Sequence, residues 1–195
     1  MASRTVSRQK KERLAAAAAE VVHRHGFART SLADVAAAAN VPLGSVHFYY
    51  RTKEELAVAV MESRVAGIRR RLERWASRRG PRARLLALVD VWVEDRESDT
   101  RHGCPIGSLC YELGKDGGSL GALAAAPFRL LLAWCALQFE DLGHGARSAR
   151  RHALHLLSAL QGMGLIANAL KDPDIILDEA RLIKGWLRSL EPAPR

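Results

Sequence analysis

Residues 41–56, VPLGSVHFYYRTKEEL, gather side chains that can donate hydrogen bonds to an anion and stack on flat surfaces. The segment holds two of the chain's three tyrosines and one of its four phenylalanines, next to a histidine, a serine and a lysine. Hydroxyl, imidazole and ammonium groups are common donors to phosphate oxygens, and the glycine allows a close backbone approach. A small core needs only one or two of these rings, so the others are available for binding.

Three predicted helices position this segment. Apolar residues at helical spacing predict a first helix over residues 7–25. Thr30 or Ser31 suits the N-cap of a second helix, Asn40 can take the left-handed conformation that ends it, and Pro42 can open a third. The tight turn between the second and third helices matches the helix-turn-helix plan, in which the later helix enters the major groove of DNA.

The predicted third helix divides into a packing face and a DNA face. Val46 and Tyr50 lie four residues apart, and we expect them to pack against the first two helices. Leu43 could pack beside them or face the groove, and the same two possibilities stay open for Phe48. The full predicted DNA-binding set is Thr30, Ser31, Leu43, Gly44, Ser45, His47, Phe48, Tyr49 and Lys53.

Residues 25–56, HGFARTSLADVAAAANVPLGSVHFYYRTKEEL, resemble the DNA-binding domain of TetR/AcrR-type transcriptional regulators. The shared marks are the Gly-Phe pair, the Thr-Ser start of the second helix, the GSVHFYY helix and the following Lys-Glu-Glu-Leu. Beyond this motif, only the length and the helical layout match. Pro42 and Leu43 stand where many relatives carry serine and lysine, and His47 where tyrosine is usual, so no operator sequence can be carried over.

The resemblance implies a ligand-responsive repressor that binds a palindromic DNA operator as a homodimer and is released by a small-molecule effector. Helical periodicity almost throughout the chain predicts an all-α fold of about nine helices. We expect an N-terminal helix-turn-helix DNA-binding domain over residues 1–52. A C-terminal helical domain for ligand binding and dimerisation is expected over residues 53–195.

The last two predicted helices, over residues 146–170 and 175–190, carry broad apolar stripes. The resemblance implies that this pair forms a four-helix bundle with the partner subunit. The alternative is that both stripes face only the chain's own core, and helices this apolar can also bury one face in each way. The predicted interface residues are Leu156, Leu157, Leu160, Met163, Gly164, Ala167, Ile176, Ala180, Ile183 and Leu187.

The middle helices are expected to enclose the effector, because ligand pockets are lined mainly by apolar and aromatic side chains. Ordinary core packing is the alternative for each lining residue. The predicted pocket residues are Trp92, Cys104, Leu109, Tyr111, Phe128, Trp134, Cys135 and Phe139.

Cys104 supports a separate hypothesis of electrophile or redox sensing. If Pro105 is the first residue of a helix, Cys104 is its N-cap, and the helix dipole with Arg101 favours the thiolate. The alternative is a small buried residue, which is the common environment of a free cysteine.

Bulk composition narrows the range of possible functions. A net charge of +9 favours a polyanionic partner, although an arginine-rich composition from a GC-rich genome has the same effect. Three cysteines without CxxC spacing and no apolar signal segment predict a soluble cytoplasmic protein. We find no catalytic, cofactor or metal-binding motif and expect no enzyme. A non-enzymatic helical module, binding a protein or a membrane surface through the arginine-dense residues 69–84, remains a competing hypothesis.

Overall fold

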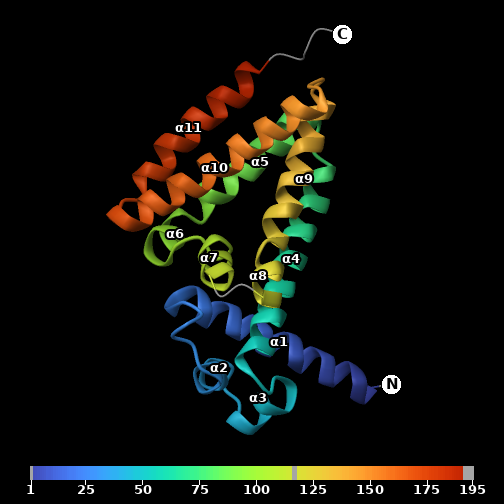
Figure 1. The fold of residues 1–195 in the computed structure, drawn as a ribbon, viewed down its shortest axis with the longest axis vertical. Helices are drawn as coiled ribbons and strands as arrows, with labels where there is room; N and C mark the ends of the chain where they lie inside the picture. The colour runs from blue at the N-terminus through green and yellow to red at the C-terminus, as the bar shows by residue number, and fades with distance from the viewer. Residues whose placement is uncertain (1, 116–117, 191–195) are drawn as a thin grey trace. The chain divides into compact units, whose positions relative to one another are not determined.

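The computed structural model describes residues 2–115 and 118–190, and these residues form helices and connecting turns without a strand (Figure 1). The all-α prediction is confirmed. Only Asp95 separates α5 from α6 and only Ala125 separates α8 from α9, so counting each pair as one gives the predicted nine helices. The helices are α1 (Ala2–His25), α2 (Leu32–Ala38), α3 (Leu43–Tyr49), α4 (Lys53–Ala76), α5 (Pro81–Glu94), α6 (Arg96–His102), α7 (Gly107–Lys115), α8 (Gly118–Ala124), α9 (Ala126–Asp141), α10 (Ala146–Leu170) and α11 (Asp174–Ser189).

The described residues divide into two compact units. The first unit is drawn from Met1–Gly67 and Ile106–Ala126, and the second from Ile68–Pro105 and Pro127–Arg195. α4 contributes to both, and α7 and α8 belong with the N-terminal helices although they lie in the middle of the chain. The functional boundary between residues 52 and 53 stays a prediction.

The first unit has its own core where α1, α2 and α3 meet. Leu14 and Ala18 of α1, Val35 of α2, and Val46 and Tyr50 at α3 are all buried. Burial of the last two confirms the predicted packing face of the third helix. Because both point inward, the other side chains of this short helix are exposed or half-buried.

Local signals set the ends of the two short helices. Ser31 is the N-cap of α2 and forms a capping box with Asp34. Asn40 has a φ of 52°, the left-handed conformation predicted at the end of this helix. The prediction that Pro42 is the first residue of the third helix is wrong by one position. Its backbone is extended, with a ψ of 144°, so it is the N-cap and the helix begins at Leu43.

The second unit is built around α10, which packs on α5, α6 and α11, while α11 also packs on α5. Leu156 and Leu160 of α10 and Ile176 and Leu187 of α11 are fully buried there. An ion pair joins α11 to α5 in this unit: the Lys184 ammonium lies 2.6 Å from a carboxylate oxygen of Asp90.

Two of the described helical stretches, Gly118–Asp141 and Ala146–Leu170, are long and apolar enough to cross a membrane by length and composition alone. Core helices of soluble proteins pass the same test. α10 uses much of its apolar surface inside the second unit, which accounts for its composition without a membrane.

A buried carboxyl group lies on α6 in the second unit. Asp99 is only 5% exposed. Burial first, and then the neighbouring Asp95 carboxylate, raise the pKa of Asp99 to about 7, with Arg71 opposing the shift. The folded chain therefore holds this proton at a pH where the unfolded chain has released it. The stabilisation from this group is complete at low pH and is lost as pH rises toward 7.

Asp99→Asn is expected to stabilise the fold at pH 8, because an amide removes the cost of a buried charge. The gain should be about 1–3 kcal/mol at pH 8 and smaller at pH 5. Urea unfolding at both pH values measures it, with Glu97→Gln on the exposed side of α6 as the control. A variant less stable than wild type at pH 8 would contradict the assignment.

Candidate nucleic-acid interface

The exposed face of α3 carries the side chains that the sequence singled out. Phe48 is 76% exposed and Leu43 is 42% exposed, so neither packs in the core. His47 is also exposed, whereas Ser45 and Tyr49 are half-buried. Gly44 has open space around the position of a Cβ atom. Five different chemical groups are therefore presented on one short helix.

Two tyrosines fix α3 to α1. The Tyr50 hydroxyl donates to the Lys11 carbonyl oxygen at 3.1 Å, and the Ser7 hydroxyl lies 3.4 Å from the Tyr49 hydroxyl. Burial, and secondarily the Glu62 carboxylate, raise the pKa of Tyr50 to about 12, so its hydroxyl stays neutral. Tyr49 in turn meets the ring of Phe48 edge-on at 5.0 Å. These contacts orient the exposed rings relative to α1.

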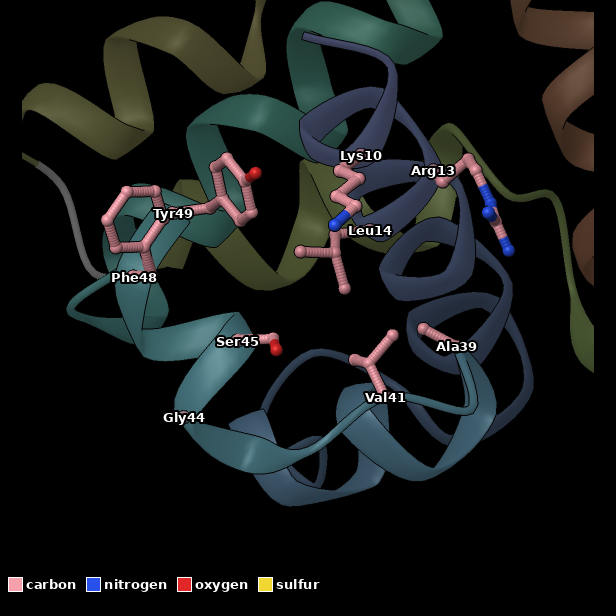
Figure 2. Close-up of a pocket in the computed structure, with 9 residues that line it drawn as sticks. All are labelled: Lys10, Arg13, Leu14, Ala39, Val41, Gly44, Ser45, Phe48 and Tyr49. Carbon is pink, nitrogen blue, oxygen red and sulfur yellow. The ribbon is translucent and has the colours of Figure 1, made fainter. Parts of the chain in front are cut away.

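A groove of about 430 Å³ runs between α1 and α3 (Figure 2). Its lining combines basic and hydroxyl side chains with apolar ones, and consists of Lys10, Arg13, Leu14, Ala39, Val41, Gly44, Ser45, Phe48 and Tyr49. Lys10 and Arg13 are both exposed. Cations beside hydroxyls and an accessible backbone suit the sugar-phosphate chain of a nucleic acid.

Lys10 and Arg13 were not among the predicted DNA-binding residues. The sequence does indicate them indirectly. Basic residues at the start of a helix interact unfavourably with its dipole, and a bound anion would offset this cost. Sequence spacing alone does not place these residues beside a helix that begins thirty residues later. The contacts of Tyr50 and Tyr49 with α1 do.

The predicted residues at the start of α2 make internal hydrogen bonds. Thr30 is buried, and its hydroxyl donates to the Gly26 carbonyl oxygen at 2.8 Å. The Ser31 hydroxyl donates to Asp34 Oδ2 at 2.7 Å, and its backbone N–H donates to the same oxygen at 2.8 Å. These bonds from Ser31 lower the pKa of Asp34. Both hydroxyls stabilise the turn, and their contact with DNA stays a prediction.

Lys53 also has an internal partner. Its ammonium donates to the Ala28 carbonyl oxygen at 2.8 Å and lies 4.6 Å from the centre of the Phe27 ring. An ammonium carries three donors, so one bond to Ala28 leaves others for a phosphate. Its phosphate contact stays a prediction.

The residues predicted for the effector pocket do not all belong to one unit. Leu109 is buried and Tyr111 is 69% exposed, and both belong to the first unit with α7. The other six belong to the second unit. There Phe139 is buried against the rings of His152 and Trp186, at centroid distances of 5.4 and 6.0 Å. The other five residues of the second unit are Trp92, Cys104, Phe128, Trp134 and Cys135.

Five buried side-chain nitrogen and oxygen atoms of the second unit lack a hydrogen-bond partner within the part of the chain that the structure describes: Arg82 Nε, Arg84 Nε, Trp92 Nε1, Thr100 Oγ1 and His144 Nε2. Two of them, the Trp92 indole N–H and the Thr100 hydroxyl, belong to uncharged side chains that carry no other side-chain donor or acceptor. Trp92 Nε1 lies against α10, 3.6 Å from the place where a Cβ atom on Gly164 would stand. Buried polar groups are usually paired, so these two require an explanation.

The prediction that Cys104 is a helix N-cap is wrong. α7 begins at Gly107, after a turn formed by Pro105 and Ile106. The dipole argument for a Cys104 thiolate therefore fails. The Cys104 sulfur is half-buried and accepts a weak hydrogen bond from Gln161 Nε2 at 3.7 Å.

Among the residues with a described placement, no group of three or more histidine, cysteine or acidic side chains could hold a metal ion.

The predicted dimer-interface residues all lie inside the second unit. Every one of Leu156, Leu157, Leu160, Met163, Gly164, Ala167, Ile176, Ala180, Ile183 and Leu187 is buried in the chain's own packing. The two stripes therefore face the chain's own core, which is one of the possibilities that the sequence left open. The exposed apolar residues of the same two helices are different ones: Leu154, Leu165, Ile166, Leu170 and Leu182.

Comparison with known proteins agrees with this geometry. Residues 14–60, which contain the α1–α3 core and the exposed face of α3, match the model of the bacterial regulatory proteins of the tetR family. The chain therefore carries the DNA-binding domain of the TetR family of transcriptional regulators. Members of this family are DNA-binding, non-enzymatic regulators, which confirms the predicted family and the expectation that the chain is not an enzyme.

A curated relative matches part of the chain at low sequence identity. A curated relative from Lactococcus lactis, an uncharacterized HTH-type transcriptional regulator in the lacX 3' region, is 26% identical over 109 residues. That match covers 54% of this chain and 56% of the relative, so the chain spans about half the length of the curated relative it matches.

Two solved TetR structures match much more of the fold. A TetR transcriptional regulator from Legionella pneumophila has a TM-score of 0.81 at 21% identity, covering 89% of this chain and 95% of its own. One from Chloroflexus aurantiacus has a TM-score of 0.80 at 20% identity, covering 95% and 97%. At these identities the similarity establishes the fold alone.

Proposed function

We propose that this TetR-family chain is a soluble, cytoplasmic repressor that binds a palindromic operator as a homodimer and is released by a small molecule. The proposed DNA binding is supported by the exposed face of α3, which lies beside the Lys10 and Arg13 side chains of α1. α3 enters the major groove, where His47 and Ser45 reach base edges or phosphates. Tyr49, Lys10 and Arg13 hold the flanking sugar-phosphate chain.

Lys10→Ala and Arg13→Ala should each weaken binding to duplex DNA about 3- to 10-fold, equally on all sequences, because phosphate contacts carry no sequence information. Each should also reduce the slope of log affinity against log salt by about one unit. Tyr49→Ala should lower affinity with a smaller change of slope, because a hydroxyl displaces no counterion. Fluorescence anisotropy over a salt series measures all three.

The matched control is Arg79→Ala, an exposed arginine of the second unit, which loses the same charge outside the groove. If the Lys10 and Arg13 variants bind DNA as the Arg79 variant does, the groove between α1 and α3 does not contact DNA.

The homodimer is proposed to form through the outer apolar face of α10 and α11. Leu165 is 70% exposed and Leu154 is 57% exposed, three turns apart on α10, with Ser158 and Gly162 between them. Leu182 on α11 is 67% exposed. Small residues between large apolar ones allow two helices to approach closely, and a two-fold axis would place each face against its copy. Such a dimer presents two α3 helices to two half-sites.

Leu165→Glu should convert the dimer to a monomer without unfolding it, because the charge would be buried only in the assembly. Sedimentation velocity measures the mass, and circular dichroism checks the helix content. Leu137→Glu is the control, since Leu137 is a similarly exposed leucine on α9. A Leu165 variant that stays dimeric would exclude this face.

The effector site is proposed to lie in the second unit. A ligand with hydrogen-bonding groups could satisfy the unpartnered Trp92 N–H and Thr100 hydroxyl, which apolar packing cannot. Release of DNA requires the ligand to bind better to a conformation whose α3 helices no longer match the two half-sites. No observation favours Cys104 sensing or a membrane-binding module over this function.

A further inference from the structure

The first unit contains a carboxylate that its DNA-binding helices do not supply. Leu109 and Leu113 of α7 are buried in this unit, and they bring Glu112, one residue away from Leu113, to the turn between α1 and α2. Glu112 Oε2 accepts a hydrogen bond from the Ala28 backbone N–H at 2.9 Å, across 84 residues of chain.

Gly26 makes room for this carboxylate. A Cβ atom at Gly26 would stand only 3.1 Å from Glu112 Oε1, and the φ of Gly26 is +82°, a conformation that other residues rarely adopt. The glycine that ends α1 therefore serves both the turn and the approach of Glu112.

Ala28 is held from its other side as well. The Lys53 ammonium of α4 donates to the Ala28 carbonyl oxygen at 2.8 Å. A carboxylate from α7 and an ammonium from α4 thus bind the two backbone polar groups of one turn residue. Hydrogen bonds to charged groups are stronger than neutral ones, so this residue has little freedom.

Hydrogen bonds connect this turn to the start of α2, and through α2 to α3. The Thr30 hydroxyl donates to the Gly26 carbonyl oxygen, and the Thr30 N–H donates to the Phe27 carbonyl oxygen at 3.1 Å. Ser31, the next residue, is the N-cap of α2. A displacement of Ala28 would therefore be transmitted to the start of α2, and α2 packs on α3.

The basic last turn of α1 attracts an acidic side chain at this place, but two other electrostatic effects oppose it. Glu112 lies beside the C-terminal end of α1, where the helix dipole repels negative charge, and it belongs to a unit that must approach phosphates. A glutamate here is accounted for by the hydrogen bond it makes.

We propose that Glu112 is a positioning residue for DNA binding: its carboxylate fixes Ala28 and thereby the orientation of α2 and α3. The inference rests on the proposed DNA-binding function and adds to it a residue far outside the helix-turn-helix segment. Glu112 acts through the turn and does not contact DNA.

Whether Glu112→Ala raises or lowers the affinity for DNA tests the proposal. Loss of a negative charge from a DNA-binding unit should by itself strengthen DNA binding, whereas loss of the positioning bond should weaken it. We expect Glu112→Ala to lower affinity for the best-bound duplex about 10-fold with an unchanged salt slope, because no phosphate contact is removed. Glu112→Gln, which keeps an acceptor oxygen, should stay within about 3-fold of wild type.

Glu20→Ala is the matched control, since Glu20 is an exposed carboxylate of α1 that pairs with Arg24 on the same helix, and its loss should leave affinity equal or higher. Amide hydrogen exchange in the full chain should become faster at Ala28 in Glu112→Ala. If Glu112→Ala does not fold, the Gln variant is tested in the same assays.

A Glu112→Ala variant that binds as tightly as Glu20→Ala would overturn the proposal. So would a Gln variant as weak as the Ala variant, or as fast in exchange at Ala28. Failure of the wild-type chain to bind any duplex is a different result, which rejects the proposed function itself.

Discussion

The burial of Val46 and Tyr50, with the Tyr50 hydroxyl bonded to the Lys11 carbonyl oxygen of α1, is the feature on which the DNA-binding surface depends. It fixes the rotation of α3 about its axis. That rotation exposes His47 and Phe48 and places Ser45 and Tyr49 along the groove shared with α1 (Figure 2). The basic residues of α1 are useful to a DNA-binding surface only because this contact brings them beside α3. A loss of the contact would therefore separate the phosphate-binding charges from the helix that enters the groove.

The second constraint is the turn that leads into α2. Its backbone groups are satisfied by side chains from three places in the sequence: Thr30 within the turn, Lys53 on α4 and Glu112 on α7. The DNA-binding unit is consequently not a contiguous segment, since it includes residues 106–126. Residues 14–60 define the family, but the geometry of the turn between α1 and α2 also depends on α7. This dependence gives the middle of the chain a direct physical connection to α2.

Local patterns predicted much of the first unit, and contacts between distant residues account for what was missed. The Ser31 cap, the left-handed Asn40 and the buried Val46 and Tyr50 follow from side-chain types at fixed spacing, which a sequence displays directly. The inward bond of Thr30 and the approach of Glu112 depend on tertiary packing, which no spacing rule encodes. In the second unit, α10 is apolar on more than one face. Periodicity identified the stripe but could not distinguish the chain's own core from an outer face, so the named residues proved to be the internal ones. Cys104 was misplaced because Pro105 begins a turn rather than a helix.

We infer that α3 recognises a specific duplex sequence as one half of a two-fold dimer. Selection of the purified full chain against random duplex DNA at near-physiological salt, followed by sequencing, tests it most directly. We expect an enriched palindrome whose half-site centres lie one helical turn, roughly 34–36 Å, or a multiple of it apart. A folded chain that enriches no sequence, or enriches a single site without two-fold symmetry, would contradict it.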